Sequence, residues 1–229
     1  YPMAAGYDVP SVDTIHRPLT LDLSEVCHED RVYWAVRRAQ DILLSSLALV
    51  ALSPLLLVTY AAIWIDSPGA SPIFTQQRVG RNGKLFKMYK FRTMCPDAEQ
   101  KLKELMEHNE KDGPVFKMKN DPRITRVGKF LRKTSIDELP QLINILRGDM
   151  SFIGPRPERP EIIAQYTEVM PEFAFRMKVK AGLAGFAQVY GKYNTSPYDK
   201  LKLDLTYIEN YSVWLDLKLM LPVSYTHLR

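Results

Sequence analysis

One long apolar stretch near the start of the chain dominates the hydrophobic pattern. Residues 42 to 65 carry no charged side chain, and a helix of that length is long enough to cross the hydrocarbon core of a bilayer. Pro54 lies near its middle, where it removes one backbone hydrogen bond and kinks a helix. Ser53 precedes it, and a serine hydroxyl is well placed to satisfy the freed backbone. The pattern therefore predicts a helix that bends at Ser53-Pro54.

The charges around this stretch bear on how it meets a membrane. Basic residues flank both ends, whereas a single span normally carries them mainly on the cytoplasmic side. Both ends can then face the same side, as in a re-entrant hairpin, with Trp34 and Trp64 at the membrane interface. A buried core helix and an ordinary kinked span remain alternatives, and the internal position disfavours a signal peptide. The flanking residues are Arg31, Arg37 and Arg38 before the stretch and Arg78, Arg81, Lys84 and Lys87 after it.

From residue 67 onward, polar and apolar positions alternate over short distances, which is typical of a soluble domain with helices and strands. A turn at residues 80–83 with an Asn-Gly step separates two short alternating segments and predicts a β-hairpin. Amphipathic periods further along predict helices. The predicted elements are strands at 73–75 and 85–91, helices at 97–109, 135–146, 160–178 and 198–221, and a Gly-rich turn with a strand at 179–192.

The segment RKTSIDELPQL, residues 132 to 142, places two adjacent carboxylates, Asp137 and Glu138, close to basic residues. Ser135 and Glu138 fit the capping box S-x-x-E, which predicts a helix that begins at Ser135 and is stopped by Gly148. On a helix, neighbouring side chains point about 100° apart, so these carboxylates do not share a proton face to face. Helix capping is one explanation for the pair, and separate chemical roles are the other.

Composition and charge limit the kinds of partner and of catalytic residue that this chain can use. The net charge of +5 and the pI near 9.1 favour an anionic partner, such as nucleic acid, a phosphorylated small molecule or a lipid headgroup. Cys27 and Cys95 belong to no C-x-x-C pair, which indicates neither a disulfide framework nor a zinc site. The four histidines are scattered, and the glycine motifs of common nucleotide-binding folds are absent. A catalyst in this sequence would work with carboxylates and cations.

Cations recur in turn-rich segments around the acidic pair. Arg156 lies between two prolines, where a stiff backbone has little entropy to lose on binding. Arginine makes fork-shaped contacts to phosphate, and adjacent carboxylates can hold a hard divalent cation such as Mg²⁺. For any single cation, simple solvation in a loop is the alternative interpretation. The cations are Lys90, Arg92, Arg123, Arg126, Arg132, Lys133 and Arg156.

Three segments closely resemble the bacterial sugar transferase family, the monotopic phosphoglycosyl transferases that start lipid-linked glycan assembly. They are YKFRTM, the block DPRITRVGKFLRKTSIDELPQLINILRGDMSFIGPRP, and VKAGLAGFAQVYGK. With the Ser-Pro apolar helix, they occur in the family's order from about Trp34 to about Leu221. The resemblance implies an α+β fold: a small α/β catalytic domain, a re-entrant membrane helix kinked at Ser53-Pro54, and peripheral amphipathic helices.

The resemblance also divides the chain into parts. Residues 1–33 are expected to be an N-terminal tail or the end of a truncated upstream region, and residues 34–66 the re-entrant membrane helix. Residues 67–221 are expected to form the catalytic domain, on the cytoplasmic face of the bacterial inner membrane. Residues 222–229 are unlike the family's ending and are expected to be a non-native or truncated tail. The chain would then correspond to the family's catalytic core.

In the family the Asp-Glu pair is catalytic, which implies roles for the matching residues here. Asp137 is expected to attack the β-phosphorus of a UDP-sugar, expel UMP and hold the phosphosugar until undecaprenyl phosphate displaces it. Asp137 and Glu138 are expected to hold the cofactor Mg²⁺ on the diphosphate. The implied partners are the UDP-sugar, undecaprenyl phosphate, membrane lipid and a second copy in a homodimer, without nucleic acid. The residues expected to bind phosphoryl oxygens are Lys90, Arg92, Arg132 and Arg156.

Two other functions fit part of the same sequence. A non-catalytic basic module, tethered to the membrane and binding anionic lipid or nucleic acid, would explain the charge and the anchor but not the acidic pair. Nucleic-acid binders also usually interleave aromatic with basic residues, and this chain lacks that pattern. The second alternative is a glycosyl transferase that moves the sugar without its phosphate. No residue specifies the sugar, and the nucleotide product, UMP, UDP or none, separates the three functions.

Overall fold

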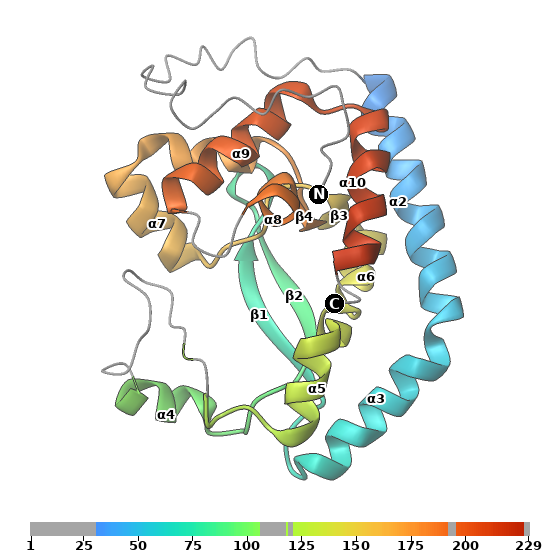
Figure 1. Ribbon diagram of the computed structural model, residues 1–229, viewed down its shortest axis with the longest axis vertical. Helices are drawn as coiled ribbons and strands as arrows, with labels where there is room; N and C mark the ends of the chain where they lie inside the picture. The colour runs from blue at the N-terminus through green and yellow to red at the C-terminus, as the bar shows by residue number, and fades with distance from the viewer. Residues whose placement is uncertain (1–30, 106–117, 119–120, 192–195, 227–229) are drawn as a thin grey trace.

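A bent helix pair runs along one side of a mixed domain of helices and short strands (Figure 1). The computed structural model describes residues 31–105, 118, 121–191 and 196–226. Its helices are α2 (Arg31–Ala51), α3 (Ser53–Asp66), α4 (Ala98–Leu105), α5 (Arg126–Thr134), α6 (Gln141–Arg147), α7 (Pro160–Val169), α8 (Phe186–Tyr190), α9 (Pro197–Asn210) and α10 (Val213–Thr226). The strands are β1 (Ile73–Val79), β2 (Leu85–Phe91), β3 (Met150–Ile153) and β4 (Ala181–Ala184), and the 3-10 helices are η2 (Arg81–Gly83), η4 (Ile136–Glu138) and η5 (Pro171–Lys178). This mixture confirms the expected α+β class.

The predicted bend in the apolar stretch is confirmed. Helices α2 and α3 meet at a bend of 62°. Pro54 lies in the first turn of α3, where a missing N–H costs least. The Ser53 hydroxyl donates to the Val50 carbonyl at 2.8 Å, the acceptor that an N–H at position 54 would have used in a continuous helix. Among the described residues, no single helix has the length and apolar character of a membrane span, although the bent pair meets that test jointly.

Helix α2 buries a polar stripe and exposes an apolar face. Tyr33, Arg37, Asp41 and Ser45 recur every four residues, which places them on one side of the helix, and all four are buried. The opposite side continues into α3, so the bent pair presents an apolar surface away from the domain. The most exposed apolar side chains, 59 to 74% exposed, are Val32, Leu43, Leu47 and Val50 on α2 and Leu57, Val58, Trp64 and Ile65 on α3.

Arg37 ties α2 to the domain. Arg37 is 3% exposed, and its guanidinium group donates to the Ser151 hydroxyl at 2.9 Å and to the Ile153 carbonyl. The Tyr33 hydroxyl accepts from Arg37 at 2.8 Å and donates to Asp216 on α10 at 2.8 Å. Of the basic residues before the bend, Arg37 is therefore not available to a membrane surface, because its guanidinium group is buried in hydrogen bonds to the domain.

The two predicted interface tryptophans have different surroundings. The Trp34 ring packs on the Tyr33 and Tyr211 rings, with centroids 5.0 and 5.3 Å away. Trp64, near the end of α3, is 62% exposed. The sequence analysis expects both rings at a membrane interface. Of the two, Trp64 points outward from the protein, whereas Trp34 packs against other aromatic rings.

Two small sheets lie in the part of the fold that follows the bent helix pair. Strands β1 and β2 pair antiparallel, with Val79 opposite Leu85, and Asn82 in the turn has φ of 57°, as an Asn-Gly hairpin turn requires. This confirms the predicted hairpin. Strands β3 and β4 pair in parallel, with Met150 opposite Ala181. The short antiparallel and parallel sheets bring segments that are far apart in sequence to one side of the domain.

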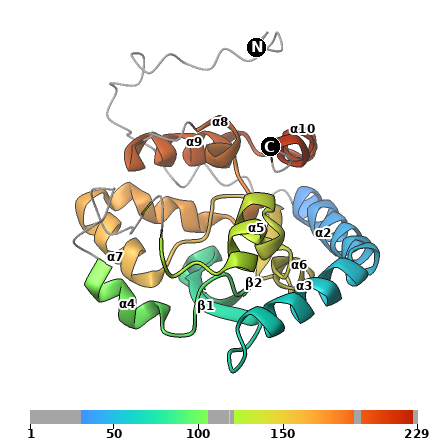
Figure 2. The same cartoon turned by 60° about the horizontal axis from the view of Figure 1, so that its bottom comes forward.

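The main core lies where β3, β4 and η5 meet α9 and α10. Figure 2 shows α8, α9 and α10 forming a layer on the side of the domain opposite α3. A separate cluster, which includes Ile63 and Leu131, joins α3 to α5, so the second half of the bent pair is also attached to the domain. The main core residues are Ile153, Phe173, Val179, Ala184, Leu201, Leu205, Tyr207, Ile208, Leu215 and Leu219.

The helix predicted to begin at Ser135 is wrong. Ser135 adopts the left-handed conformation, with φ of 56°, and ends α5, while its side chain makes no capping hydrogen bond. Residues 136–138 form the single 3-10 turn η4. Pro140 has no N–H to donate to the Ile136 carbonyl, which instead accepts from Leu139 at 3.1 Å. Helix α6 consequently begins at Gln141, and Gly148 ends it as predicted.

Other local predictions are corrected by residues that cap or break helices. Helix α5 falls in a segment interpreted as turns, and the Thr125 hydroxyl caps it by accepting from the Gly128 N–H at 3.0 Å. The helix expected over 198–221 is two helices, and the Ser212 hydroxyl accepts from the Leu215 N–H at the start of the second. Helix α10 continues to Thr226, beyond the expected end at 221. Residues 160–178 form α7 and η5, which divide before Pro171.

Some predictions fall outside the described residues. Helix α4 covers the described part of the helix expected at 97–109. Residues 1–30 and 227–229 belong to the two expected tails and are outside the described ranges, as are Cys27 and the four histidines. Cys95 is described and forms no disulfide.

Candidate active site

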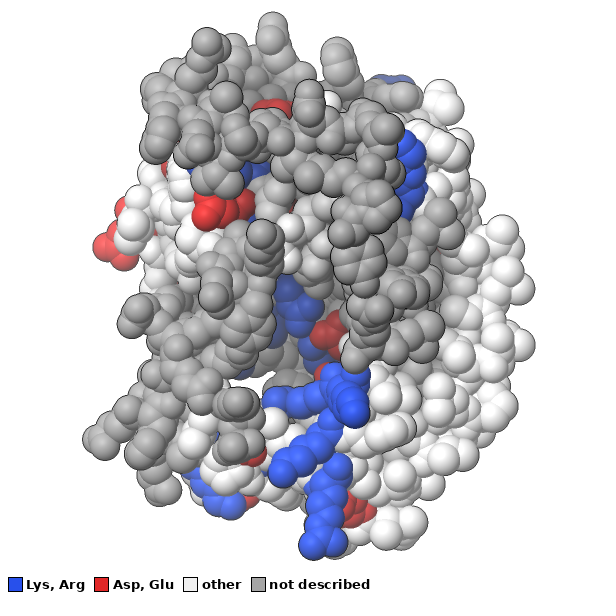
Figure 3. Space-filling view, viewed as in Figure 1, with Lys and Arg blue, Asp and Glu red and all other residues white. Residues whose placement is uncertain are grey.

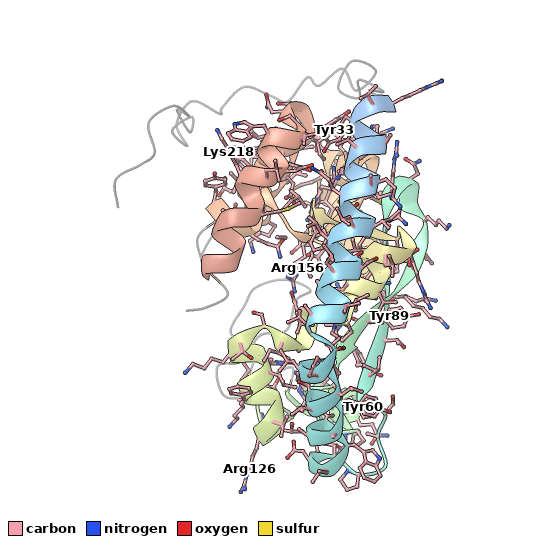
Figure 4. The ribbon with its side chains drawn as sticks, turned by 90° about the vertical axis from the view of Figure 1, so that its right-hand side faces the viewer. Tyr33, Tyr60, Tyr89, Arg126, Arg156 and Lys218 are labelled. Carbon is pink, nitrogen blue, oxygen red and sulfur yellow. The ribbon has the colours of Figure 1, made fainter. Side chains whose placement is uncertain are left out.

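Glu138 is the point where three segments of the chain meet. Its Oε1 atom accepts from Lys90 Nζ at 2.7 Å and from Arg156 Nη2 at 3.0 Å. Lys90 comes from β2, Glu138 from η4, and Arg156 from the loop that follows β3. Figure 4 shows Arg156 at a level between α10 and α5. The fold thus brings together three of the residues singled out in the sequence, from positions up to 66 residues apart.

The two cations set the ionisation of Glu138. Burial by itself favours the neutral acid, but the charges of Arg156 and Lys90 outweigh it and lower the pKa of Glu138 to about 2. The Glu138 and Lys90 side chains are 17 and 18% exposed, and burial lowers the pKa of Lys90 even though Glu138 opposes that shift. Glu138 is therefore a permanent anion that holds two cations in place.

Asp137 has a different environment from its neighbour. No ion pair reaches it from any residue that the structure describes. Burial raises the pKa of Asp137, and the negative charge of Glu138 raises it further, while the positive charges of Lys90 and Arg132 lower it. Asp137 is therefore a partly desolvated carboxylate without a bound counter-charge, which is the state in which a carboxylate is most reactive as a nucleophile.

The loop that carries Arg156 is held by backbone hydrogen bonds. The Gly154 N–H donates to the Ala184 carbonyl at 2.8 Å, and the Pro155 carbonyl accepts from the Gly182 N–H at 3.0 Å. A Cβ atom on Gly154 would collide with the Lys180 carbonyl, so this close approach of two chain segments requires glycine. Residues 156–159 adopt no regular secondary structure, and the Arg156 side chain is 46% exposed.

The remaining predicted cations divide into those near the acidic pair and those that are not. Arg132, on α5, donates to the Thr93 hydroxyl at 2.9 Å. Burial lowers the pKa of Arg132, and the negative charge of the nearby Asp137 opposes this shift. Arg92 donates to the Ser71 carbonyl at 2.7 Å, and no contact between described residues joins it to either carboxylate. The structure therefore does not bring Arg92 to the acidic pair.

Helix α5 carries a row of exposed cations beside this site. Arg123, which precedes the helix, is unavailable because it is 5% exposed and paired with Asp121 at 2.6 Å. Arg126, Lys129 and Lys133 are exposed at positions that fall on one helix face. Figure 3 shows lysine and arginine side chains gathered over this part of the molecule. Phe130 lies among them and is 60% exposed.

Several residues that shape the site were missed in the sequence. Arg78 on β1 donates to the Pro157 carbonyl at 3.1 Å. Asn144, fully buried on α6, accepts from the Tyr89 N–H at 3.0 Å and donates to the Lys87 carbonyl at 2.7 Å, which holds the edge of β2 that presents Lys90. Asn144 had a usable signal, because a polar side chain at a core-facing helix position needs polar partners. Arg78 stood in no motif that would mark it.

The carboxylates can hold a metal only together with a substrate. In the parts of the chain that are described, no group of three or more His, Cys, Asp or Glu residues could hold a metal ion. Among the described residues, Asp137 has no ion pair, and the two hydrogen bonds that Glu138 accepts from side chains use the same oxygen, Oε1, which leaves Oε2 to ligate. One or two carboxylates plus substrate phosphates are a usual Mg²⁺ site. The donor set therefore fits Mg²⁺ bound with a phosphorylated ligand.

Glu138→Gln should destabilise the fold at neutral pH by on the order of 2 kcal/mol, because Lys90 and Arg156 lose their shared anion. The folded pKa of about 2 lies below the ordinary 4.5, so this stabilisation is complete above about pH 4.5 and disappears as pH falls toward 2. Chemical denaturation across this pH range measures both effects. Glu161→Gln, at an exposed glutamate on α7, is the control and should change little. Equal stabilities of Glu138→Gln and the unchanged protein at neutral pH would contradict the ion-pair assignment.

Known proteins resemble this chain over most of its described length. A galactosyl transferase, CpsE, of Streptococcus agalactiae is 47% identical over 158 residues, 69% of this chain and 34% of the relative. The UDP-N-acetylgalactosamine-undecaprenyl-phosphate N-acetylgalactosaminephosphotransferase of Aeromonas hydrophila is 42% identical over 188 residues, 81% of this chain and 42% of the relative. A putative undecaprenyl-phosphate N-acetylgalactosaminyl 1-phosphate transferase of Bacillus subtilis is 45% identical over 145 residues, 63% of this chain and 74% of the relative.

The chain spans less than half the length of the first two of these relatives. The family model for the bacterial sugar transferases matches residues 32–228 of this chain. That range covers the acidic pair, the Arg156 loop and all but the first residue of the bent helix pair. On the strength of that match, this protein belongs to the bacterial sugar transferase family.

Proposed function

We propose that this chain carries the catalytic core of a phosphoglycosyl transferase, which moves a sugar 1-phosphate from a UDP-sugar to undecaprenyl phosphate and releases UMP. The main observation behind the proposal is the difference between the two adjacent carboxylates. Glu138 binds two cations, and Asp137 binds none of the described ones. The Aeromonas and Bacillus relatives, which are named as undecaprenyl-phosphate transferases of a sugar phosphate, support the same reaction.

In the first step, Asp137 acts as the nucleophile. One carboxylate oxygen bonds to the β-phosphorus of the UDP-sugar, while the bond from that phosphorus to the bridging oxygen breaks and UMP leaves with the electron pair. Lys90 and Arg156, fixed by Glu138 at 2.7 and 3.0 Å, supply positive charge where negative charge develops on the phosphoryl oxygens. Arg132 adds charge from the α5 side.

In the second step, undecaprenyl phosphate takes the phosphosugar from the enzyme. A phosphate oxygen of the lipid bonds to the same phosphorus, the acyl-phosphate bond breaks, and Asp137 returns as a free carboxylate. The lowered pKa of Glu138 keeps the cation pair assembled through both steps. Mg²⁺, held by Asp137 and Glu138 with the diphosphate, would supply Lewis-acid neutralisation of phosphate charge when bound.

Membrane attachment through the bent helix pair belongs to the proposal, because one substrate is water-soluble and the other stays in the bilayer. The exposed apolar face of α2 and α3 suits lipid contact, and the 62° bend suits a re-entrant hairpin that enters and leaves on the cytoplasmic side of the inner membrane. The neighbouring α5 carries Phe130 among exposed cations, a combination typical of helices at a lipid surface. The site beside α5 would then lie at headgroup level.

The nucleotide product tests the reaction type. Detergent-solubilised protein with Mg²⁺, undecaprenyl phosphate and a panel of UDP-sugars should release UMP in proportion to lipid-linked product. Release of UDP instead would support sugar transfer without phosphate, the activity for which the galactosyl transferase of Streptococcus is named. No nucleotide release with any UDP-sugar would leave a non-catalytic basic module.

Asp137→Asn should abolish turnover and the covalent phosphosugar intermediate without loss of stability. The amide keeps the shape but is not a nucleophile. Because burial raises the pKa of Asp137, the ionised carboxylate disfavours folding; this penalty develops as pH rises through the unfolded pKa and is complete above the folded pKa. The variant, which carries no charge at this position, should therefore melt at or above the temperature of the unchanged protein at neutral pH. Mass spectrometry after incubation with donor alone detects the intermediate. Near-normal turnover by Asp137→Asn would refute the assignment.

The re-entrant topology makes a labelling prediction. In a protein without Cys27 and Cys95, single cysteines at Val32 and Ser71, both exposed positions, should react with an impermeant thiol reagent from the cytoplasmic side only. A cysteine at Val50, 74% exposed beside the bend, is the control and should resist labelling because lipid covers it. Labelling of the Val32 position from the periplasmic side would instead identify a span that crosses the membrane.

A further inference from the structure

Arg176 and Asp204 form a buried ion pair behind the loop that carries Arg156. Arg176 Nε donates to Asp204 Oδ2 at 2.8 Å, and the two side chains are 9 and 2% exposed. They belong to η5 and α9, which contribute no residue to the acidic pair or its cations. Because desolvation offsets most of the attraction in a buried ion pair, stability alone is a weak explanation for this one.

Another nitrogen of the Arg176 guanidinium contacts the loop that carries Arg156. Arg176 Nη2 donates to the Arg156 carbonyl at 3.2 Å, and the Arg156 side chain in turn donates to Glu138 at 3.0 Å. A planar guanidinium holds two acceptors in a fixed relation, which the single ammonium group of lysine does not. A continuous chain of contacts therefore runs from α9, through Asp204 and Arg176, to the backbone of Arg156 and to Glu138.

The surroundings explain why the loop needs such a support. A small pocket lies between the loop and η5, lined by Pro155, Arg156, Pro157, Glu158, Arg176 and Met177. Side chains do not fill the space between the loop and η5, so the hydrogen bond from Arg176 adds a contact that packing does not supply there. The Arg176 guanidinium is itself oriented over the Phe173 ring, 4.7 Å from its centroid. Phe173 is a core residue, so the support is anchored in the rigid part of the domain.

We propose that Arg176, oriented by Asp204, is a positioning residue that fixes the Arg156 backbone so that the Arg156 guanidinium meets the phosphoryl group transferred at Asp137. The proposal rests on the function proposed above, because only that reaction gives Arg156 a phosphoryl group to meet. Arg176 touches no reacting atom and acts only through Arg156.

A double-mutant cycle in the full chain tests this relation. Arg176→Gln should lower kcat for UMP release by on the order of tenfold to a hundredfold, the usual effect of a misplaced phosphate-binding group. In an Arg156→Ala background, the same change should lower kcat no more than about twofold further, because residues that act through one another are not additive. The melting temperature should fall by the same amount in both backgrounds, since the buried pair is lost in each.

Two variants separate positioning from stability. Arg176→Lys keeps the charge opposite Asp204 but cannot reach both acceptors, so it should recover most of the melting temperature and little of the kcat. Asp204→Asn frees Arg176 to turn away and should show the same dependence on Arg156, even if Arg176→Gln fails to fold. Arg123→Gln is the matched control: it breaks a pair of similar burial, Arg123 with Asp121 at 2.6 Å, and should lower the melting temperature while leaving kcat unchanged.

The outcomes distinguish this proposal from the function on which it rests. Rate losses of Arg176→Gln and Arg156→Ala that multiply in full, or wild-type kcat in Arg176→Lys, would overturn the positioning role while the reaction stands. Full activity of Arg156→Ala would remove the role of Arg156 itself, and the positioning role with it. A large loss in each single variant, with little further loss in the double variant, supports both.

Discussion

The shared acceptance of two cations by one oxygen of Glu138 is the interaction on which the site depends. Lys90 and Arg156 repel each other, and each is supplied by a different part of the fold, so neither would stay near the other without an anion between them. Glu138 stands on a single turn between two helices, where its backbone is determined by Ser135 on one side and Pro140 on the other. The hairpin, the turn and the loop after β3 are thereby joined into one electrostatic unit. Asp137, the residue before Glu138, is left without an ion-pair partner among the described residues.

Much of the fold could be predicted from local signals. The kink at Ser53-Pro54 and the hairpin turn at Asn82 follow from residues whose backbone preferences are strong and do not depend on distant neighbours. The start of α6 could not be predicted in the same way, because Ser135 and Glu138 match a capping box that competes with the left-handed end of α5 and with Pro140. A capping-box motif shows that these residues can start a helix, but they can also adopt other conformations, and the packing of the whole fold decides which one forms.

The acidic pair and its cations show the same limit for the site. The stiffness of the GPRP segment pointed to Arg156, and the fold brings that residue to Glu138. Arg92 had equal standing in the sequence, yet it turns to the Ser71 carbonyl at the base of the hairpin. Arg78 and Arg176 carried no local signal for this role, since each donates to a backbone carbonyl of the Arg156 loop, about eighty and twenty residues away in sequence. Hydrogen bonds to backbone atoms leave almost no trace in side-chain patterns, because any residue can supply the carbonyl.

The polar stripe buried under α2 has a consequence for attempts to make a soluble form of this protein. Removal of α2 by truncation would delete Arg37 and Tyr33, and the Ser151 hydroxyl and the Ile153 carbonyl would lose the hydrogen bonds that Arg37 donates. Of the described hydrogen bonds to its carboxylate, Asp216 would keep only the one from Tyr207. Such groups are costly to leave without partners. Helix α2 is thus part of the folding unit of the domain. A water-soluble version would have to keep α2 and exchange its outward leucines and valines for polar residues.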